Sequence, residues 1–287
     1  MWGFGFILRR FFTVLSKSDI DHHFDSPEAL IEEAEEALVA FKRILDQFYS
    51  RSNPTIVSDA EAKTGNKIIK IRFPNPGRPI RRSAYRVVDG ARHALDQAVY
   101  AATICFDGKT CGTKTYFPFA IDPDDFENQF KVIRTDRGKN VFGRTKDATP
   151  KIAATIKAFE PWWTGKSHLG GNDILRFLGK IANPNKHEVT LTVIPNIDAN
   201  WINDASLNEV VKFSMPPKRI GATNDFELVT LAPNGNFKYN GGFAYSIGLS
   251  KTHLNVPRGA VQALSEMVDV SRNLVFAIKD VCIQELT

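Results

Sequence analysis

Apolar and polar residues form two opposed stripes along residues 81–104, the most informative helical pattern in the chain. The two sets repeat every three to four positions and lie about half a turn apart, as on one face and the other of an α-helix. The pattern therefore predicts a helix that packs with one face and presents charge on the other. The apolar stripe is Ala84, Val88, Ala91, Leu95, Ala98 and Ala102, and the charged stripe is Arg82, Arg86, Asp89, His93 and Asp96.

Two further long helices are predicted, one on each side of this stretch. An acidic amphipathic pattern covers residues 27–49, where Ser26 suits the N-cap and Pro27 the first helical position. Residues 257–282 are apolar on two sides, which is typical of a helix deep in a bundle. Shorter helices are expected over residues 150–159 and 172–181.

Apolar and polar residues alternate in the segments that we predict as strands. Residues 55–58 and 67–73 form a predicted β-hairpin. Later strands are expected at 189–193, 210–213, 226–231 and 243–249, with Asn234-Gly235 as a hairpin turn. The polar segment 105–149 is expected to be irregular surface.

The grouping of strands between helices, without regular alternation, predicts an α+β fold: a helical bundle with an N-terminal β-hairpin and a small antiparallel sheet before the last helix. We expect a single domain over residues 1–287. Its parts are an N-terminal docking segment (1–25), helices with the hairpin 55–73 (26–187), antiparallel strands (188–250) and a C-terminal helix (257–284). The aromatic N-terminal segment is too short to span a membrane, and an interfacial anchor is the alternative to docking.

The charge of the chain is unevenly distributed. The net charge is +5, and residues 63–92 contain nine Lys and Arg against one acid, Asp89. Such a cluster favours a polyanionic partner, either RNA, DNA or a nucleotide phosphate, and a solvated basic surface is the alternative. The three cysteines lack the spacing of a zinc site, so we expect reduced thiols and a cytoplasmic protein. No Rossmann, P-loop, zincin or α/β-hydrolase motif occurs, and neither a metal nor a cofactor is expected.

Residues 90–100, Gly-Ala-Arg-His-Ala-Leu-Asp-Gln-Ala-Val-Tyr, resemble the Arg-Ser-Ala-Leu-Asp-His signature helix of a widespread, largely uncharacterised bacterial family. Asn-Lys-His at 185–187 is similar to that family's later Asp-Lys-His. The signature is in turn similar to the Arg-x-x-x-x-His motif of HEPN-type helical bundles, many of which are metal-independent RNases of toxins and antiviral systems. The resemblance implies that Arg92 and Asp96 match the motif, whereas Gln97 stands at the position of its histidine.

A glutamine cannot exchange a proton near neutral pH, so catalysis needs a substitute for the missing histidine. His93, which shares a helix face with Arg86, and His187 are the two candidates. Cleavage through the ribose 2′-hydroxyl needs a base, an acid and a cation at the phosphate. We therefore predict these catalytic residues: Arg86, Arg92, His93, Asp96 and His187. The predicted substrate-binding residues are Arg82, Lys186 and Asn183.

A structural interpretation of the same residues stays open. Arg86, Asp89, His93 and Asp96 would then be a polar seam, Arg92 and Asp96 an ion pair, and His187 a cap at a helix end. The expected function is that of a HEPN-like, metal-independent RNA- or nucleotide-directed protein, such as an endoribonuclease of a toxin or phage-defence type. The alternative is a catalytically inactive module that binds nucleic acid, nucleotides or protein partners in a larger complex, or that forms a homo-oligomer.

Overall fold

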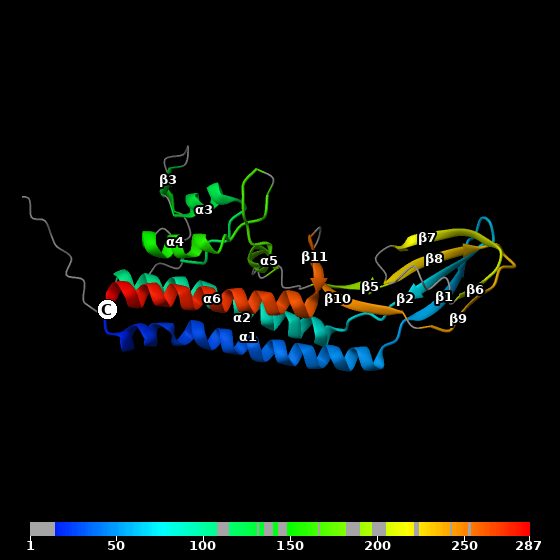
Figure 1. The fold of residues 1–287 in the computed structure, drawn as a ribbon, viewed down its shortest axis with the longest axis horizontal. Coiled ribbons are helices and arrows are strands. Elements are labelled where there is room, and N and C mark those ends of the chain that lie inside the picture. The colour runs from blue at the N-terminus through cyan, green and yellow to red at the C-terminus, as the bar shows by residue number, and fades with distance from the viewer. Residues whose placement is uncertain are drawn as a thin grey trace, which may run out of the picture. The chain divides into compact units, whose positions relative to one another are not determined.

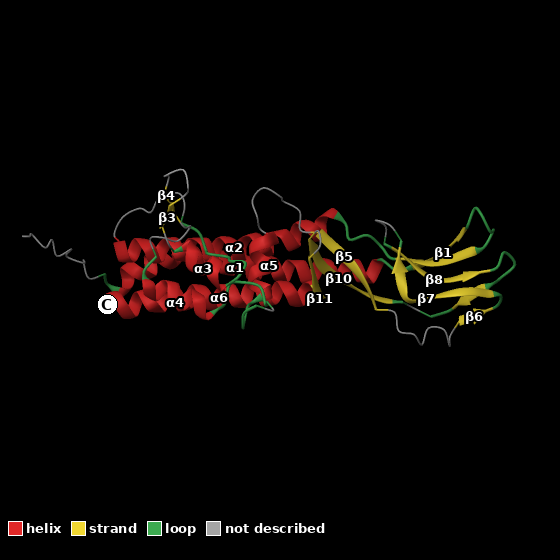
Figure 2. Ribbon diagram, turned by 90° about the horizontal axis from the view of Figure 1, so that it is seen from above, coloured by secondary structure: helices red, strands yellow, loops and turns green. Residues whose placement is uncertain are grey.

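The computed structural model describes residues 15–107, 115–130, 132–134, 140–142, 148–165, 167–181, 190–196, 205–220, 224–241, 243–251 and 254–287. Over these residues the fold is α+β, with six helices and small antiparallel sheets, which confirms the predicted class (Figures 1 and 2). The chain divides into two compact units. Unit 1 comprises Met1–Glu33, Asp89–Lys180 and Met267–Thr287, and unit 2 comprises Ala34–Val88 and Ile181–Glu266. The expectation of a single domain stays a prediction.

Helix α1 (Lys17–Arg51) begins well before the predicted start at Pro27, which lies inside it. The start is fixed by a reciprocal cap. The Asp19 N–H donates to Ser16 Oγ at 3.2 Å, and the Ser16 N–H donates to Asp19 Oδ2 at 3.0 Å. An internal proline removes one backbone hydrogen bond. The prediction was wrong because the fully buried Ile20 holds the earlier turns to the core despite that loss.

Unit 1 contains two layers of helices. Parts of α1, of α2 (Arg78–Asp107) and of α6 (Ala260–Leu286) belong to it. Three short helices cover α2 and α6 on the side away from α1 (Figures 1 and 2). These are α3 (Pro123–Gln129), α4 (Pro150–Ala158) and α5 (Asp173–Ile181), and the hairpin of β3 (Val132–Arg134) and β4 (Asn140–Phe142) follows α3.

The short helices of unit 1 follow local signals. Helices α4 and α5 confirm the two predicted segments, and Thr149 caps α4 through its side chain, as its position before Pro150 indicates. Helix α3 lies in the segment that we expected to be irregular, so that expectation was wrong there. It has seven residues, Asp122 as its N-cap and Phe126 as its buried residue. A helix this short leaves too few apolar positions for a periodic signal.

Unit 2 is built around an antiparallel four-stranded sheet of order β1-β2-β8-β7. The predicted hairpin is confirmed, with Thr55 opposite Arg72. A three-stranded sheet β11-β10-β5 and a pair β6-β9 complete the strands of the described residues. The strands are β1 (Thr55–Ala60), β2 (Lys67–Arg72), β5 (Thr190–Asn196), β6 (Ala205–Leu207), β7 (Val210–Arg219), β8 (Asp225–Leu231), β9 (Phe237–Tyr239), β10 (Ala244–Lys251) and β11 (Leu254–Gly259).

Two predictions for unit 2 were wrong. Asn234-Gly235 follows β8 in a turn, but β8 pairs with β2 and β7, so both of its edges are occupied and β9 pairs with β6 instead. The last helix begins at Ala260, because Pro257 belongs to β11. Among the described helices, none combines the length and the apolar content that crossing a membrane requires.

Helix α2 is the element that positions the candidate site. All six residues of its predicted apolar stripe are fully buried, which confirms the stripe. The helix begins at Arg78, before the predicted start, because a proline such as Pro79 is tolerated in the first turn, where its missing N–H has no helical partner. The earlier start places Arg78 on the same helix as Arg82 and Arg86.

Candidate functional site

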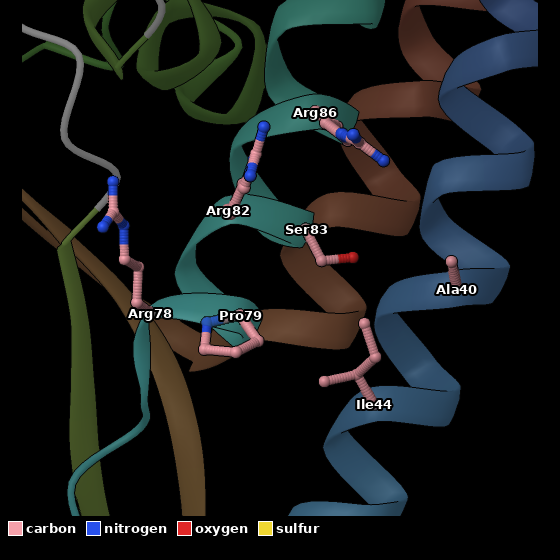
Figure 3. Close-up of a pocket in the computed structure, with 7 residues that line it drawn as sticks. All are labelled: Ala40, Ile44, Arg78, Pro79, Arg82, Ser83 and Arg86. Atoms are coloured by element: carbon pink, nitrogen blue, oxygen red, sulfur yellow. The ribbon is translucent and has the colours of Figure 1, made fainter.

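A cavity of about 480 Å³ opens between α1 and α2 within unit 2 (Figure 3). We call it the arginine groove. Helix α1 supplies a small apolar part of its lining, and the first turns of α2 supply the rest. The lining residues are Ala40 and Ile44 from α1, and Arg78, Pro79, Arg82, Ser83 and Arg86 from α2.

Three arginines line the groove at intervals of four residues. Arg78, Arg82 and Arg86 therefore succeed one another about once per helical turn, roughly 6 Å apart along the axis. All three side chains are exposed. In the part of the chain that the structure describes, no hydrogen bond or ion pair holds any of them, and no acidic residue lines the groove. Their charges are thus available to an anionic ligand.

Ser83 adds a hydroxyl to the same cavity. The residue is only 8 % exposed, yet it lines the groove. Figure 3 shows the hydroxyl and the Arg86 side chain directed toward α1. Among the described residues, nothing forms a hydrogen bond with this hydroxyl. In this position the hydroxyl can donate a hydrogen bond to a ligand oxygen beside Arg86.

In unit 1, Arg92 and Asp96 form a closed polar network. Arg92 Nε donates to Asp96 Oδ2 at 3.0 Å, and Nη1 donates to the carbonyl of Gly179 at 3.4 Å. The guanidinium carbon lies 4.3 Å from the centre of the Phe119 ring. Asp96 Oδ1 accepts from the Phe117 N–H at 2.8 Å. The predicted ion pair is confirmed, and it connects α2 to residues 117–119 and to α5.

The burial of this network bears on its role. The Arg92 and Asp96 side chains are 11 % and 16 % exposed. Each is paired with the other and also forms a hydrogen bond with a backbone group. These contacts are sufficient to explain both residues as structural. Their catalytic assignment stays a prediction.

His93 presents a different environment on the same helix. Its side chain is 56 % exposed, and Nδ1 lies 3.7 Å from Asp89 Oδ2. Gln97, one turn later, is also exposed. His93 is therefore accessible to a substrate, and the Asp89 carboxylate lies close enough to orient its imidazole.

The structure brings two of the predicted site residues, Arg82 and Arg86, into the arginine groove. Arg92, His93 and Asp96 belong to unit 1, whereas the groove belongs to unit 2. Three predicted residues lie outside the described residues, so their convergence with the helix stays a prediction: Asn183, Lys186 and His187.

Arg78 and Ser83 were not among the site residues predicted from the sequence. Arg78 continues the four-residue spacing of Arg82 and Arg86, but the predicted helix began at Arg81 and so did not include it. Ser83 carried no signal of its own. Ala40 and Ile44 were missed because no local pattern indicates which residues of α1 border α2.

The described residues contain no cluster of three His, Cys, Asp or Glu side chains suited to a metal ion. The pair of His22 Nδ1 and Asp25 Oδ2, at 3.2 Å, is strongly exposed. Comparison of the chain with protein-family models, with curated proteins and with solved structures gives no match.

Proposed function

We propose that this protein binds RNA through phosphate groups held in the arginine groove. The observation that carries the proposal is a set of three exposed arginines around one cavity, none of which has a side-chain partner among the described residues. Guanidinium groups bind phosphate oxygens through charge-assisted, often bidentate hydrogen bonds. Neutralising several phosphates also releases counterions, which drives binding at low salt.

The spacing of the arginines supports the same function. Like charges four residues apart on a helix repel each other and cost about 0.2–0.5 kcal/mol per pair. Arg78, Arg82 and Arg86 contain two such pairs without a compensating acid in the groove. A phosphate chain lying along the helix would turn this repulsion into attraction.

The surrounding charge favours a polyanion as well. Residues 34–88 contain eleven Lys and Arg against five Asp and Glu. A local positive field of this kind attracts an anionic chain before contact is made. The choice of RNA among polyanions is supported by the resemblance of residues 90–100 to the HEPN-type signature helix, and DNA of the same sequence is the comparison that tests it.

The test is a binding titration with a fluorescent RNA of about 12 nucleotides, a length typical of single-strand sites. At about 50 mM salt we expect wild-type protein to bind, and Arg82→Gln with Arg86→Gln to weaken binding about tenfold or more. Arg81→Gln is the matched control, because Arg81 is exposed on the same helix but does not line the groove. Absence of binding, or equal losses in the control and the double variant, would contradict the proposal.

A second candidate function is metal-independent RNA cleavage of the HEPN type, with His93 as the proton-transferring group. It is favoured by the exposure of His93 and by the carboxylate of Asp89 beside its ring. An endoribonuclease of a toxin or phage-defence type would use such a group near neutral pH. Gln97 supplies no proton, so His93 is the histidine of this helix on which cleavage would depend.

Cleavage is tested by incubating RNA with the protein and EDTA between about pH 5 and pH 9. This candidate predicts degradation that His93→Gln abolishes and His22→Gln leaves unchanged. His22 is a suitable control because it is exposed on α1, also in unit 1. If no RNA is degraded at any pH, the catalytic candidate is excluded and RNA binding is tested on its own.

A further inference from the structure

The two walls of the arginine groove differ in chemistry. The α2 wall is cationic, with Arg82, Arg86 and the Ser83 hydroxyl. The α1 wall is apolar and consists of Ala40, which is exposed, and Ile44, which is half-buried. The two residues are four apart and therefore lie on one face of α1, opposite the cationic wall (Figure 3).

Single-stranded RNA matches this asymmetry. A single strand exposes its phosphates along one edge and its unpaired bases along the other, so one nucleotide can contact a cationic and an apolar wall together. A duplex hides the faces of its bases in the stack and offers mainly phosphates and ribose. Ile44 and Ala40 would gain little from a duplex.

The size of the groove also favours a single strand over a duplex. A volume of about 480 Å³ falls within the range of sites for small molecules and nucleotides, about 300–1,000 Å³. One nucleotide of a longer strand is of the right size for such a space. A duplex is much wider and would reach only the outer ends of the exposed arginines.

We infer that the arginine groove takes single-stranded RNA in one orientation, with phosphates on the Arg82, Ser83 and Arg86 wall and bases on the Ala40 and Ile44 wall, and that it discriminates against duplex RNA. This inference rests on the proposed RNA binding and adds the strandedness and the orientation of the ligand. Ser83 would donate its hydrogen bond to a phosphate oxygen that also contacts Arg86.

The experiment compares two RNAs of one sequence, a single strand and the same strand annealed to its complement, on the full chain. We expect the single strand to bind about tenfold more tightly than the duplex. Ile44→Ser should weaken single-strand binding about fivefold, because an apolar contact with a base is lost, and should leave duplex binding and the salt dependence unchanged. Val39→Ser is the control, since Val39 is 68 % exposed on α1 and does not line the groove.

The outcomes separate this inference from the proposed function. Equal or tighter binding of the duplex overturns the inference while RNA binding stands. Efficient displacement of the RNA by adenosine monophosphate at equal concentration also overturns it, since the groove would then be a mononucleotide site. Binding of neither RNA overturns the proposed function, and the inference with it. Thermal melting of Ile44→Ser and Val39→Ser shows whether both variants are folded.

Discussion

Helix α2 carries two kinds of arginine, which differ in their exposure and in their side-chain partners. Arg92 in unit 1 is 11 % exposed and is held by Asp96, by a backbone carbonyl and by an aromatic ring. Arg82 and Arg86 in unit 2 are exposed, line a cavity and have no partner among the described residues. A buried, paired arginine holds the fold together, whereas an exposed, unpaired one is available to a ligand.

The residue four positions later explains much of the difference. Arg92 is followed at that distance by Asp96, an attractive pair, whereas Arg82 is followed by Arg86, a repulsive one. The attractive pair is then buried against residues 117–119 and α5, where it satisfies backbone groups as well. The repulsive pair stays at the surface beside α1. Four variants test this contrast, and they follow from the largest expected effect to the smallest.

Asp96→Ala is expected to lower the free energy of unfolding by about 3 kcal/mol, because it leaves the Arg92 charge buried without its partner and the Phe117 N–H without its acceptor. Urea unfolding measures the change. Gln97→Ala, on the exposed face of the same helix, is the control and should change stability by less than about 0.5 kcal/mol. A loss for Asp96→Ala as small as the control's would show that the network does not hold the fold.

Replacing Arg78, Arg82 and Arg86 together by Gln is expected to weaken single-strand binding about thirtyfold at low salt and to reduce the slope of log K against log salt by about 2. The free energy of unfolding should not fall, since two repulsive pairs are removed. Titrations at several salt concentrations provide the slope. An unchanged slope in the folded variant would separate the groove from RNA binding.

Asp225→Asn tests whether pairing, and not membership of a unit, decides the role of an arginine. Arg72 in unit 2 binds Asp225 through two hydrogen bonds of 2.9 Å. We expect a loss of about 1–2 kcal/mol in the free energy of unfolding at neutral pH and no change in RNA affinity. A stability equal to that of the wild type, with weaker RNA binding, would contradict the assignment.

The same pair predicts a pH dependence. The hydrogen bonds from Arg72 lower the pKa of Asp225 below its ordinary value. Its stabilising contribution is therefore complete above the unfolded pKa, about 3.9, and is lost as the pH falls through the lower folded pKa. The difference in stability between wild type and Asp225→Asn should accordingly shrink at the acidic end of a urea series.

Ser83→Ala is expected to have the smallest effect, a loss of about threefold in RNA affinity, because one neutral hydroxyl donor to a phosphate is removed. The salt slope should not change, since no charge is lost. This distinguishes Ser83 from its arginine neighbours. An affinity equal to that of the wild type would place the phosphate away from this side of the groove.

The sequence was sufficient for the parts of the molecule that depend on local pattern. The buried stripe of α2, the hairpin of β1 and β2, and the ion pair of Arg92 with Asp96 all follow from spacing. The start of α1 was also readable, since Ser16 and Asp19 form a capping box. The predicted start was Pro27, because Ser26 suits the N-cap and a proline suits the first helical position.

The groove could not be predicted in full, because it depends on which faces of two helices meet. Arg82 and Arg86 were expected to bind substrate or take part in catalysis, but the apolar wall of Ala40 and Ile44 belongs to α1, which a β-hairpin separates from α2 in the sequence. The pairing of β8 with β2 and β7 is another long-range outcome. Strand partners of this kind are decided by tertiary packing, which no local pattern contains.

The most direct test follows the arginine side chains themselves during an RNA titration, by NMR of their Nε–H groups. Without RNA, we predict a slowly exchanging Nε–H signal for Arg92, which is bonded to Asp96, and rapid exchange for Arg82 and Arg86. On addition of single-stranded RNA, the Arg82 and Arg86 signals should shift and become protected while that of Arg92 stays in place. A shift of the Arg92 signal with no change at Arg82 and Arg86 would contradict the account.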